Sequence, residues 1–133
     1  MITKHLQAPS HEQARHLVVA SYDFAKHGGA IGDIVLDTSA LPDNAIITQA
    51  WIDVVTAPTS GGSATMALTV QSAGDIKAAL AVASWTGIVA CVPVGTAASA
   101  IKLTAERKVT MAIAVAALTA GKIKVFVEYI QSE

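Results

Sequence analysis

The chain has 133 residues, a formal net charge of −1 and only 14% charged side chains, whereas roughly a quarter of the residues in a typical soluble domain are charged. This length suits one domain and is too short for two ordinary ones. The nine Lys and Arg residues are scattered, which argues against nucleic acid as a partner, because phosphate backbones are bound by clustered basic side chains.

The predicted domain begins after a polar N-terminal segment. Residues 1–14 contain Pro9 among polar side chains, and we expect them to form an extended arm outside the core. Residues 15–133 are expected to form a single domain. Strand-like alternation starts in residues 15–24, and a glycine turn precedes a second short strand at residues 31–36.

The middle of the chain contains the longest predicted strand, residues 45–56. Both of its faces are partly apolar, so a central position in a sheet is expected. A turn at residues 41–44 precedes this strand, and a loop rich in Pro, Ser and Gly is predicted at residues 57–62. Residues 64–71 form another predicted strand, whereas residues 75–83 favour a short helix or an irregular segment.

The C-terminal part predicts an antiparallel hairpin, after a short strand at residues 99–104 and a charged turn at 105–108. Apolar side chains alternate in residues 109–115 and again in residues 123–129, on either side of a glycine-containing connection at 119–122. The apolar side of this hairpin is expected to supply core residues, namely Val109, Met111, Ile113, Val115, Val125 and Val127.

The predicted elements together indicate an all-β domain. About seven short strands, frequent turn signals and at most one short helix are typical of an antiparallel β-sandwich or barrel. The sequence has no fixed-period repeat and no internal linker that would mark a domain boundary.

The opposite face of residues 109–116 is small and uncharged, although the solvent side of a sheet is usually polar. A low overall charge agrees with a surface that is covered by other copies of the chain or by a partner. The alternative is a compact, Ala-rich protein that stays soluble alone. The residues predicted to form a subunit interface are Ala112, Ala114, Ala116 and Trp51.

No pattern in the chain defines a catalytic, cofactor-binding or metal-binding site, and we expect no enzyme. The four histidines lack the close spacing of zinc ligands: His5, His11, His16 and His27. Four carboxylates fit solvated turns and strand ends as well as a catalytic pair: Asp23, Asp33, Asp37 and Asp53. Cys91 is the single cysteine, so no internal disulfide is possible, and it is expected to be a small buried hydrophobe.

Two features bear on membranes and on sugars. The uncharged stretch at residues 78–101 is interrupted by polar residues, Gly and Pro, which argues against a membrane-spanning helix. The start of the chain lacks the apolar core of a signal peptide, so synthesis in the cytoplasm is expected. Trp51 and Trp85 fit either core or interface anchors or a platform for a sugar ring.

Five segments carry a resemblance to a known family: AIGDIVL at 30–36, LPDNAIIT at 41–48, VPVGTAASAIKLT at 92–104, LTAGK at 118–122 and VFVEY at 125–129. Together they resemble small virion proteins of tailed bacteriophages, in particular the capsid cement, or decoration, proteins. The resemblance covers residues 15–132 and rests on turns and strands without a catalytic motif.

The resemblance implies a jelly-roll-like β-sandwich over residues 15–133 and a noncatalytic structural role. Proteins of this kind lie on the exterior of the capsid, bind the major capsid protein and stabilise the head, commonly as homo-oligomeric dimers or trimers. Such a virion protein would be made in the cytoplasm of the bacterial host. The alternative function is a β-sandwich binding module of a tail or fibre, which recognises a host glycan or receptor.

Overall fold

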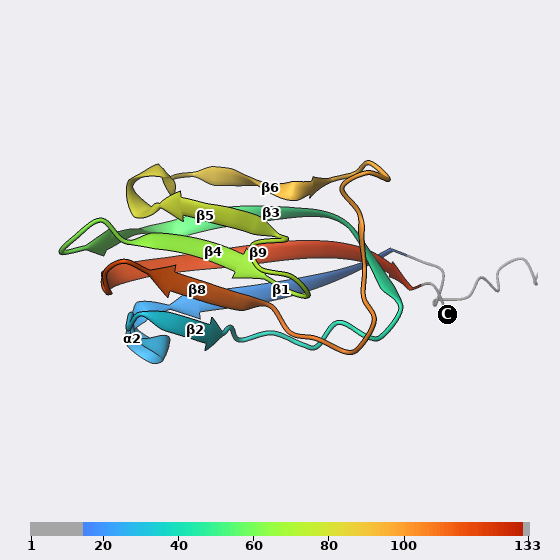
Figure 1. Ribbon diagram of the computed structural model, residues 1–133, viewed down its shortest axis with the longest axis horizontal. Helices are drawn as coiled ribbons and strands as arrows, with labels where there is room; N and C mark the ends of the chain where they lie inside the picture. The colour runs from blue at the N-terminus through green and yellow to red at the C-terminus, as the bar shows by residue number, and fades with distance from the viewer. Residues whose placement is uncertain (1–14, 132–133) are drawn as a thin grey trace, which may run out of the picture.

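The computed structural model describes residues 15–131, which form two antiparallel sheets packed face to face (Figure 1). Sheet A contains, in spatial order, β1 (Arg15–Asp23), β9 (Leu118–Gln131), β3 (Ala45–Ser60) and β6 (Ile88–Val94), and β7 (Ile101–Lys102) pairs with β3. Sheet B contains, in order, β2 (Gly32–Val35), β8 (Thr110–Ala114), β4 (Thr65–Thr69) and β5 (Lys77–Ala81). Two short helical turns complete the described chain, α2 (Phe24–His27) and η2 (Val82–Ser84).

The strand order is that of a jelly roll. Along the chain, β1, β3, β6 and β9 enter sheet A, and β2, β4, β5 and β8 enter sheet B, so most connections cross from one sheet to the other. With the two-residue β7 set aside, two four-stranded sheets linked in this way are the double Greek-key arrangement of jelly-roll domains. The predicted all-β, jelly-roll-like sandwich is therefore confirmed; the predicted arm, residues 1–14, lies outside the described residues.

The core lies between the two sheets and is apolar throughout. In each long strand every second side chain points inward, as in β9, where Ile123, Val125 and Val127 are buried. Trp85 and Tyr22 are the largest fully buried side chains, and the indole Nε1 of Trp85 donates a hydrogen bond to the carbonyl oxygen of Leu80 at 3.1 Å. No polar or charged residue of the described part of the chain is classed as buried.

The predicted C-terminal hairpin is wrong. β8 pairs with β2 and β4 in sheet B, whereas β9 pairs with β1 and β3 in sheet A, so the two apolar faces meet across the core. Val115, predicted to be in the core, is 69% exposed with φ 74°, at the connection where the chain changes sheets. Alternation shows which side of a strand is buried, but it does not show which strand is its neighbour.

Three further predictions need correction. β3 runs through most of the predicted loop at 57–62, because irregular pairing with β9 accommodates Pro58 opposite Gly121, which lies within β9. Residues 75–83, where a short helix or irregular segment was favoured, contain β5 and the start of η2, since pairing with β4 outweighs the local helical pattern. The predicted strand at 99–104 is reduced to the two residues of β7.

Candidate functional site

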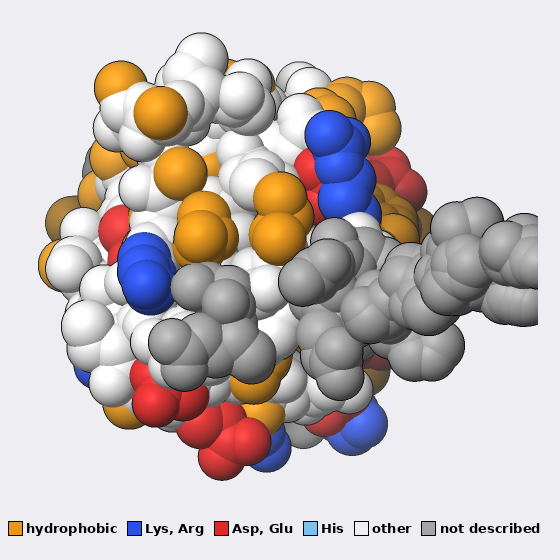
Figure 2. Space-filling model, turned by 90° about the vertical axis from the view of Figure 1, so that its right-hand side faces the viewer, with side chains coloured by type: hydrophobic (Ala, Val, Ile, Leu, Met, Phe, Trp, Pro, Cys, Tyr) orange, Lys and Arg blue, Asp and Glu red, His pale blue; other side chains and the backbone are white. Residues whose placement is uncertain are grey.

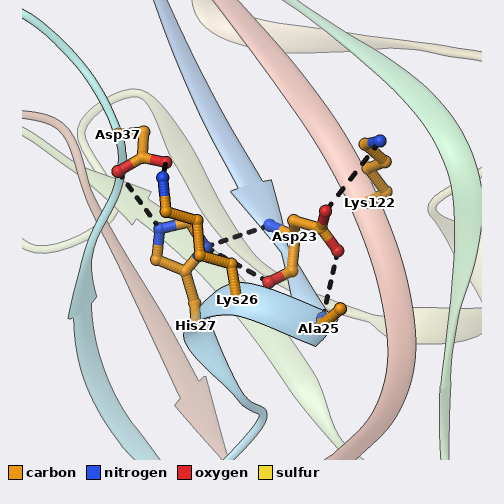
Figure 3. Close-up of polar contacts among 6 residues, drawn as sticks. All are labelled: Asp23, Ala25, Lys26, His27, Asp37 and Lys122. Carbon is orange, nitrogen blue, oxygen red and sulfur yellow. Dashed lines mark hydrogen bonds and ion pairs between the residues drawn. The ribbon is translucent and has the colours of Figure 1, made fainter.

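A cluster of polar and charged side chains lies at the corner where β1 passes into α2 (Figure 3). Asp23 caps this turn, because its Oδ1 accepts a hydrogen bond from the backbone N–H of Ala25 at 3.0 Å. Nδ1 of His27 lies 3.1 Å from the backbone nitrogen of Asp23 and 3.2 Å from its carbonyl oxygen. Lys122 of β9 places its Nζ 3.9 Å from Oδ2 of Asp23.

A second carboxylate joins this corner from the segment after β2. Lys26 donates a hydrogen bond from Nζ to Oδ2 of Asp37, and Nε2 of His27 lies 3.6 Å from Oδ1 of the same residue. The hydrogen bond from Lys26, with the nearby Lys26 and His27 charges, lowers the pKa of Asp37. Backbone hydrogen bonds in both directions between Ser21 and Asp37 bring the two segments together.

Tyr22 supports the corner from the core side. Its hydroxyl donates a hydrogen bond to the carbonyl oxygen of Gly28, and its ring stacks on His27 with centroids 5.6 Å apart. Burial, and secondarily the Asp23 charge, raises the pKa of Tyr22. Each polar group named here has a partner within the chain, so the arrangement can fix the turn between β1 and β2. It lacks a nucleophile beside a base and an adjoining cavity.

The rest of the described chain offers no better chemical site. Between residues 15 and 131 there is no group of three His, Cys, Asp or Glu residues placed to hold a metal ion, and no cavity that would enclose a small ligand. Figure 2 shows one end of the sandwich, where acidic and basic side chains are interspersed and the visible surface has no opening into the core. The four candidate carboxylates are dispersed: only Asp23 and Asp37 share a cluster, while Asp33 lies on sheet B and Asp53 on sheet A.

The outer face of sheet A is the largest chemical feature outside the core. We call it the sheet A face and define it by three rows of side chains that follow the register across β1, β9, β3 and β6. The central row is Val19, Phe126, Trp51 and Ala90, the row on one side is Leu17, Glu128, Gln49 and Val94, and the row on the other side is Ser21, Lys124, Asp53 and Ile88.

The sheet A face is unusually apolar for a surface. Trp51 is 42% exposed at its centre, and the strands at its margins expose Leu17 and Val19 on β1 and Ile88 and Val94 on β6. Contiguous exposed apolar residues on a soluble protein indicate an interaction surface. The sequence alone indicates exposed apolar residues, because β1 and β6 carry apolar side chains on both of their faces. Only the sheet order shows that these two strands flank β9 and β3.

The outer face of sheet B has a different character. Its side chains are short and mostly Ala and Thr, in cross-strand pairs such as Ala112 with Ala67 and Ala114 with Thr65. Ala114 is exposed and Ala112 half-buried, whereas Ala116 packs partly against the core in the connection to β9. Trp51 lies on the opposite sheet, so the predicted interface residues are not brought together: they belong to two faces on opposite sides of the sandwich.

The remaining candidate residues have structural positions. Cys91 is buried in β6, and burial raises the pKa of its thiol to about 11. Trp85 is buried in the core, which leaves Trp51 as the exposed tryptophan of the pair. His16 stacks on Tyr129 with ring centroids 5.0 Å apart, while His5 and His11 lie outside the described residues.

Residues 15–131 form a jelly-roll β-sandwich with an apolar outer face on sheet A and no enclosed cavity among them. Solved structures that share this fold include a chain of the acidic stable capsid of Helicobacter pylori bacteriophage KHP30, with a TM-score of 0.62, 15% identity, and coverage of 87% of this chain and 86% of that one. A chain of the cyanophage Pam1 capsid asymmetric unit matches with a TM-score of 0.60 and 22% identity, over 86% of this chain and 83% of that one.

A third similar structure is a chain of the capsid of Ralstonia phage GP4, with a TM-score of 0.56, 19% identity, and coverage of 89% of this chain and 86% of that one. At these identities the likeness shows a shared fold. No protein-family model matches the sequence, and no curated protein matches it. No helix within residues 15–131 is long and apolar enough to cross a membrane.

Proposed function

We propose that this chain is a noncatalytic structural protein of a bacteriophage virion, which acts as a capsid cement, or decoration, protein. In this role it binds the major capsid protein on the exterior of the head, as a homo-oligomer, after synthesis in the cytoplasm of the bacterial host. The observation that carries the proposal is an exposed apolar sheet face on a jelly-roll domain whose fold is shared with chains of three phage capsid structures.

The physical basis of the role is multivalent contact. A protein that bridges several shell subunits gains from each additional contact, because the second contact forms at a high effective concentration once the first is made. Flat sheet faces with few charges suit such packing, since little charge must be removed from water. The short Ala and Thr side chains around Ala112 and Ala114 allow a neighbouring surface to approach sheet B closely, and we propose this face as a contact with subunits of the shell.

The proposal is tested on heads from the phage that encodes this chain, with its gene intact or deleted. We expect the chain to co-purify with DNA-filled heads and to form regular density on their outer surface in cryo-electron microscopy. Heads from the deletion should release DNA at a lower temperature or a milder osmotic shock, and purified chain should restore their resistance. Absence of the chain from purified heads, or equal resistance of both preparations, would exclude the cement role.

A substitution tests the contribution of sheet B. Ala114→Glu adds a charge to the exposed part of this face, and it should weaken binding to depleted heads while leaving the urea midpoint of the free chain nearly unchanged. Ala105→Glu is the matched control, because Ala105 is also exposed but lies in the connection before β8. Equal binding by both variants would remove sheet B from the proposed contact.

A second candidate function rests on Trp51. An exposed tryptophan with Gln49 and Asp53 in the adjoining rows is a possible platform for a sugar ring, as in a tail or fibre module that binds a host glycan. This function predicts selective binding on a glycan array that Trp51→Ala abolishes, and density at the tail instead of the head. An array without binding would exclude it for the glycans tested.

A further inference from the structure

We propose that the sheet A face binds a second copy of this chain, and that two chains pack sheet A against sheet A in a two-fold dimer. The proposal specifies the face and the symmetry of the homo-oligomer in the proposed function, and it is argued from the side-chain pattern of this face. The two central strands, β9 and β3, carry aromatic residues in one row and opposite charges in another, and the two outer strands, β1 and β6, carry aliphatic residues in two of the three rows. A two-fold axis parallel to the strands and between β9 and β3 exchanges each of these pairs.

The central row reads almost the same in both directions. Across β1, β9, β3 and β6 it runs aliphatic, aromatic, aromatic, aliphatic, from Val19 through Phe126 and Trp51 to Ala90. Under the two-fold exchange, Phe126 of one copy faces Trp51 of the other, and the same contact forms again on the other side of the axis. Large aromatic side chains at the centre of a patch are the residues that contribute most to binding.

The charged positions are complementary under the same exchange. Lys124 on β9 and Asp53 on β3 occupy one flanking row, so Lys124 of each copy faces Asp53 of the other. They are cross-strand neighbours in the same chain, but neither residue forms an ion pair within residues 15–131, so both charges can also contact a second copy. In the opposite flanking row Leu17 of one copy faces Val94 of the other.

A two-fold axis along the rows is the competing arrangement, and it would place Lys124 over Glu128 of the second copy. Glu128 already has internal partners, because its Oε1 accepts hydrogen bonds from Thr48 and Gln49, each at 3.0 Å, and lies 3.8 Å from a guanidinium nitrogen of Arg15. A new partner would therefore compete with contacts that exist in the free chain. Both axes superimpose the four strands, but only the axis between β9 and β3 places Lys124 opposite Asp53, the two charges without an ion pair in the described chain.

The area of the sheet A face determines the affinity that we expect for the dimer. Four strands about 4.8 Å apart, taken over the nine residues of β1 at about 3.3 Å per residue, give a flat footprint of roughly 600 Å². A standard stable interface buries about 800 Å² on each partner. We therefore expect a dimer of moderate strength, and sedimentation equilibrium should extend from about 1 µM to about 500 µM to observe both species.

The decisive experiment uses charge reversal and recombination. Lys124→Glu and Asp53→Lys should each raise the dimer dissociation constant at least about tenfold, because each places like charges opposite one another twice in the dimer. An equimolar mixture of the two variants should dimerise about as well as the unaltered chain, since both intermolecular contacts are again between opposite charges. Urea unfolding of each variant verifies that the chains remain folded. Two weakened variants that fail to recover on mixing would overturn the proposed pairing.

Substitutions at the centre of the face and on the other sheet identify the surface. Trp51→Glu should abolish the dimer up to the highest concentration, whereas Ala114→Glu on sheet B should leave the dissociation constant unchanged. An unaltered chain that stays monomeric, a trimer, or a dimer broken only by Ala114→Glu would each overturn the proposal. A monomer that still decorates phage heads would remove the dimer and the homo-oligomeric part of the proposed function but leave the virion role intact, so the two proposals fail separately.

Discussion

A single methyl group at Gly29 should destabilise the fold, because this residue lies against the start of β9. A Cβ atom there would be 2.5 Å from the carbonyl oxygen and 2.8 Å from the Cβ of Leu118, closer than real Cβ contacts allow. The backbone N–H of Leu118 also donates a hydrogen bond to the carbonyl oxygen of Gly29 at 2.8 Å. Because the opposing oxygen is backbone, the Gly29→Ala change can be accommodated only by separating the two segments.

The expected cost follows from two contributions. Overpacking typically costs about 1–3 kcal/mol, and weakening a backbone hydrogen bond adds about 0.5–1.5 kcal/mol. We therefore expect Gly29→Ala to lower the free energy of unfolding by about 2–4 kcal/mol. In urea, with a slope of about 1–3 kcal/mol per molar, the midpoint should fall by about 1 M or more.

Gly61 provides the matched control for this substitution. A Cβ built on Gly61 meets nothing within 4 Å, and its φ is outside the left-handed region. Gly61→Ala should therefore be neutral or stabilise the protein by up to about 1 kcal/mol, by restricting the unfolded chain. A Gly29→Ala variant within about 0.5 kcal/mol of the unaltered chain would refute the reasoning, since the contact with Leu118 would then be able to relax freely.

Three further outcomes are expected. Trp85→Ala should lower the free energy of unfolding in urea by about 3–5 kcal/mol, because the side chain is fully buried. Trp51→Ala in the monomer should lower it by less than about 1 kcal/mol. Equal losses would contradict the burial of these two side chains. The Lys26 contact lowers the pKa of Asp37, so it stabilises the fold at pH values above the ordinary pKa of 3.8 and is lost as the pH falls through the folded-state pKa. Below about pH 4 the melting temperature of the unaltered chain should therefore fall more than that of Asp37→Asn. An identical fall in both proteins would contradict this. With its pKa raised to about 11, the buried Cys91 thiol should not react with a thiol reagent at about pH 8 until denaturant is added; rapid reaction of the folded chain would contradict its position.

The fold class could be predicted because it depends on local patterns. Alternating apolar residues in 109–113 and 123–127 correctly identified buried strand faces, and turn residues marked most strand ends. The pairing of β8 and β9 could not be read from these patterns, because the two strands are close in sequence and yet belong to different sheets. A hairpin and a crossing between sheets require the same alternation and differ only in the partners contributed by distant strands.

The grouping of the proposed interface residues could not be predicted for the same reason. Trp51 and Ala114 were both predicted as interface residues, but their separation onto different sheets required knowledge of which strands share a sheet. The sheet A face depends on residues from four strands that span positions 17 to 128 of the chain, and only the register aligns Val19, Phe126 and Trp51 in one row. The corner cluster was also missed, because Asp37 reaches His27 through the path of the chain and without a sequence motif.

The two sheet faces suit different kinds of contact, and this difference connects the two proposals. The sheet A face combines bulky aromatics with opposite charges, so it favours one partner in one orientation. The sheet B face has short side chains around Ala112 and Ala114, with one charge, Asp33, beside Ala112, so it permits close approach but contributes little directional preference. A dimer formed through sheet A would leave two copies of sheet B facing outward on opposite sides. Each copy could then contact a different shell subunit, and loss of the dimer by Trp51→Glu should weaken attachment to depleted heads even though Trp51 itself would not touch the shell.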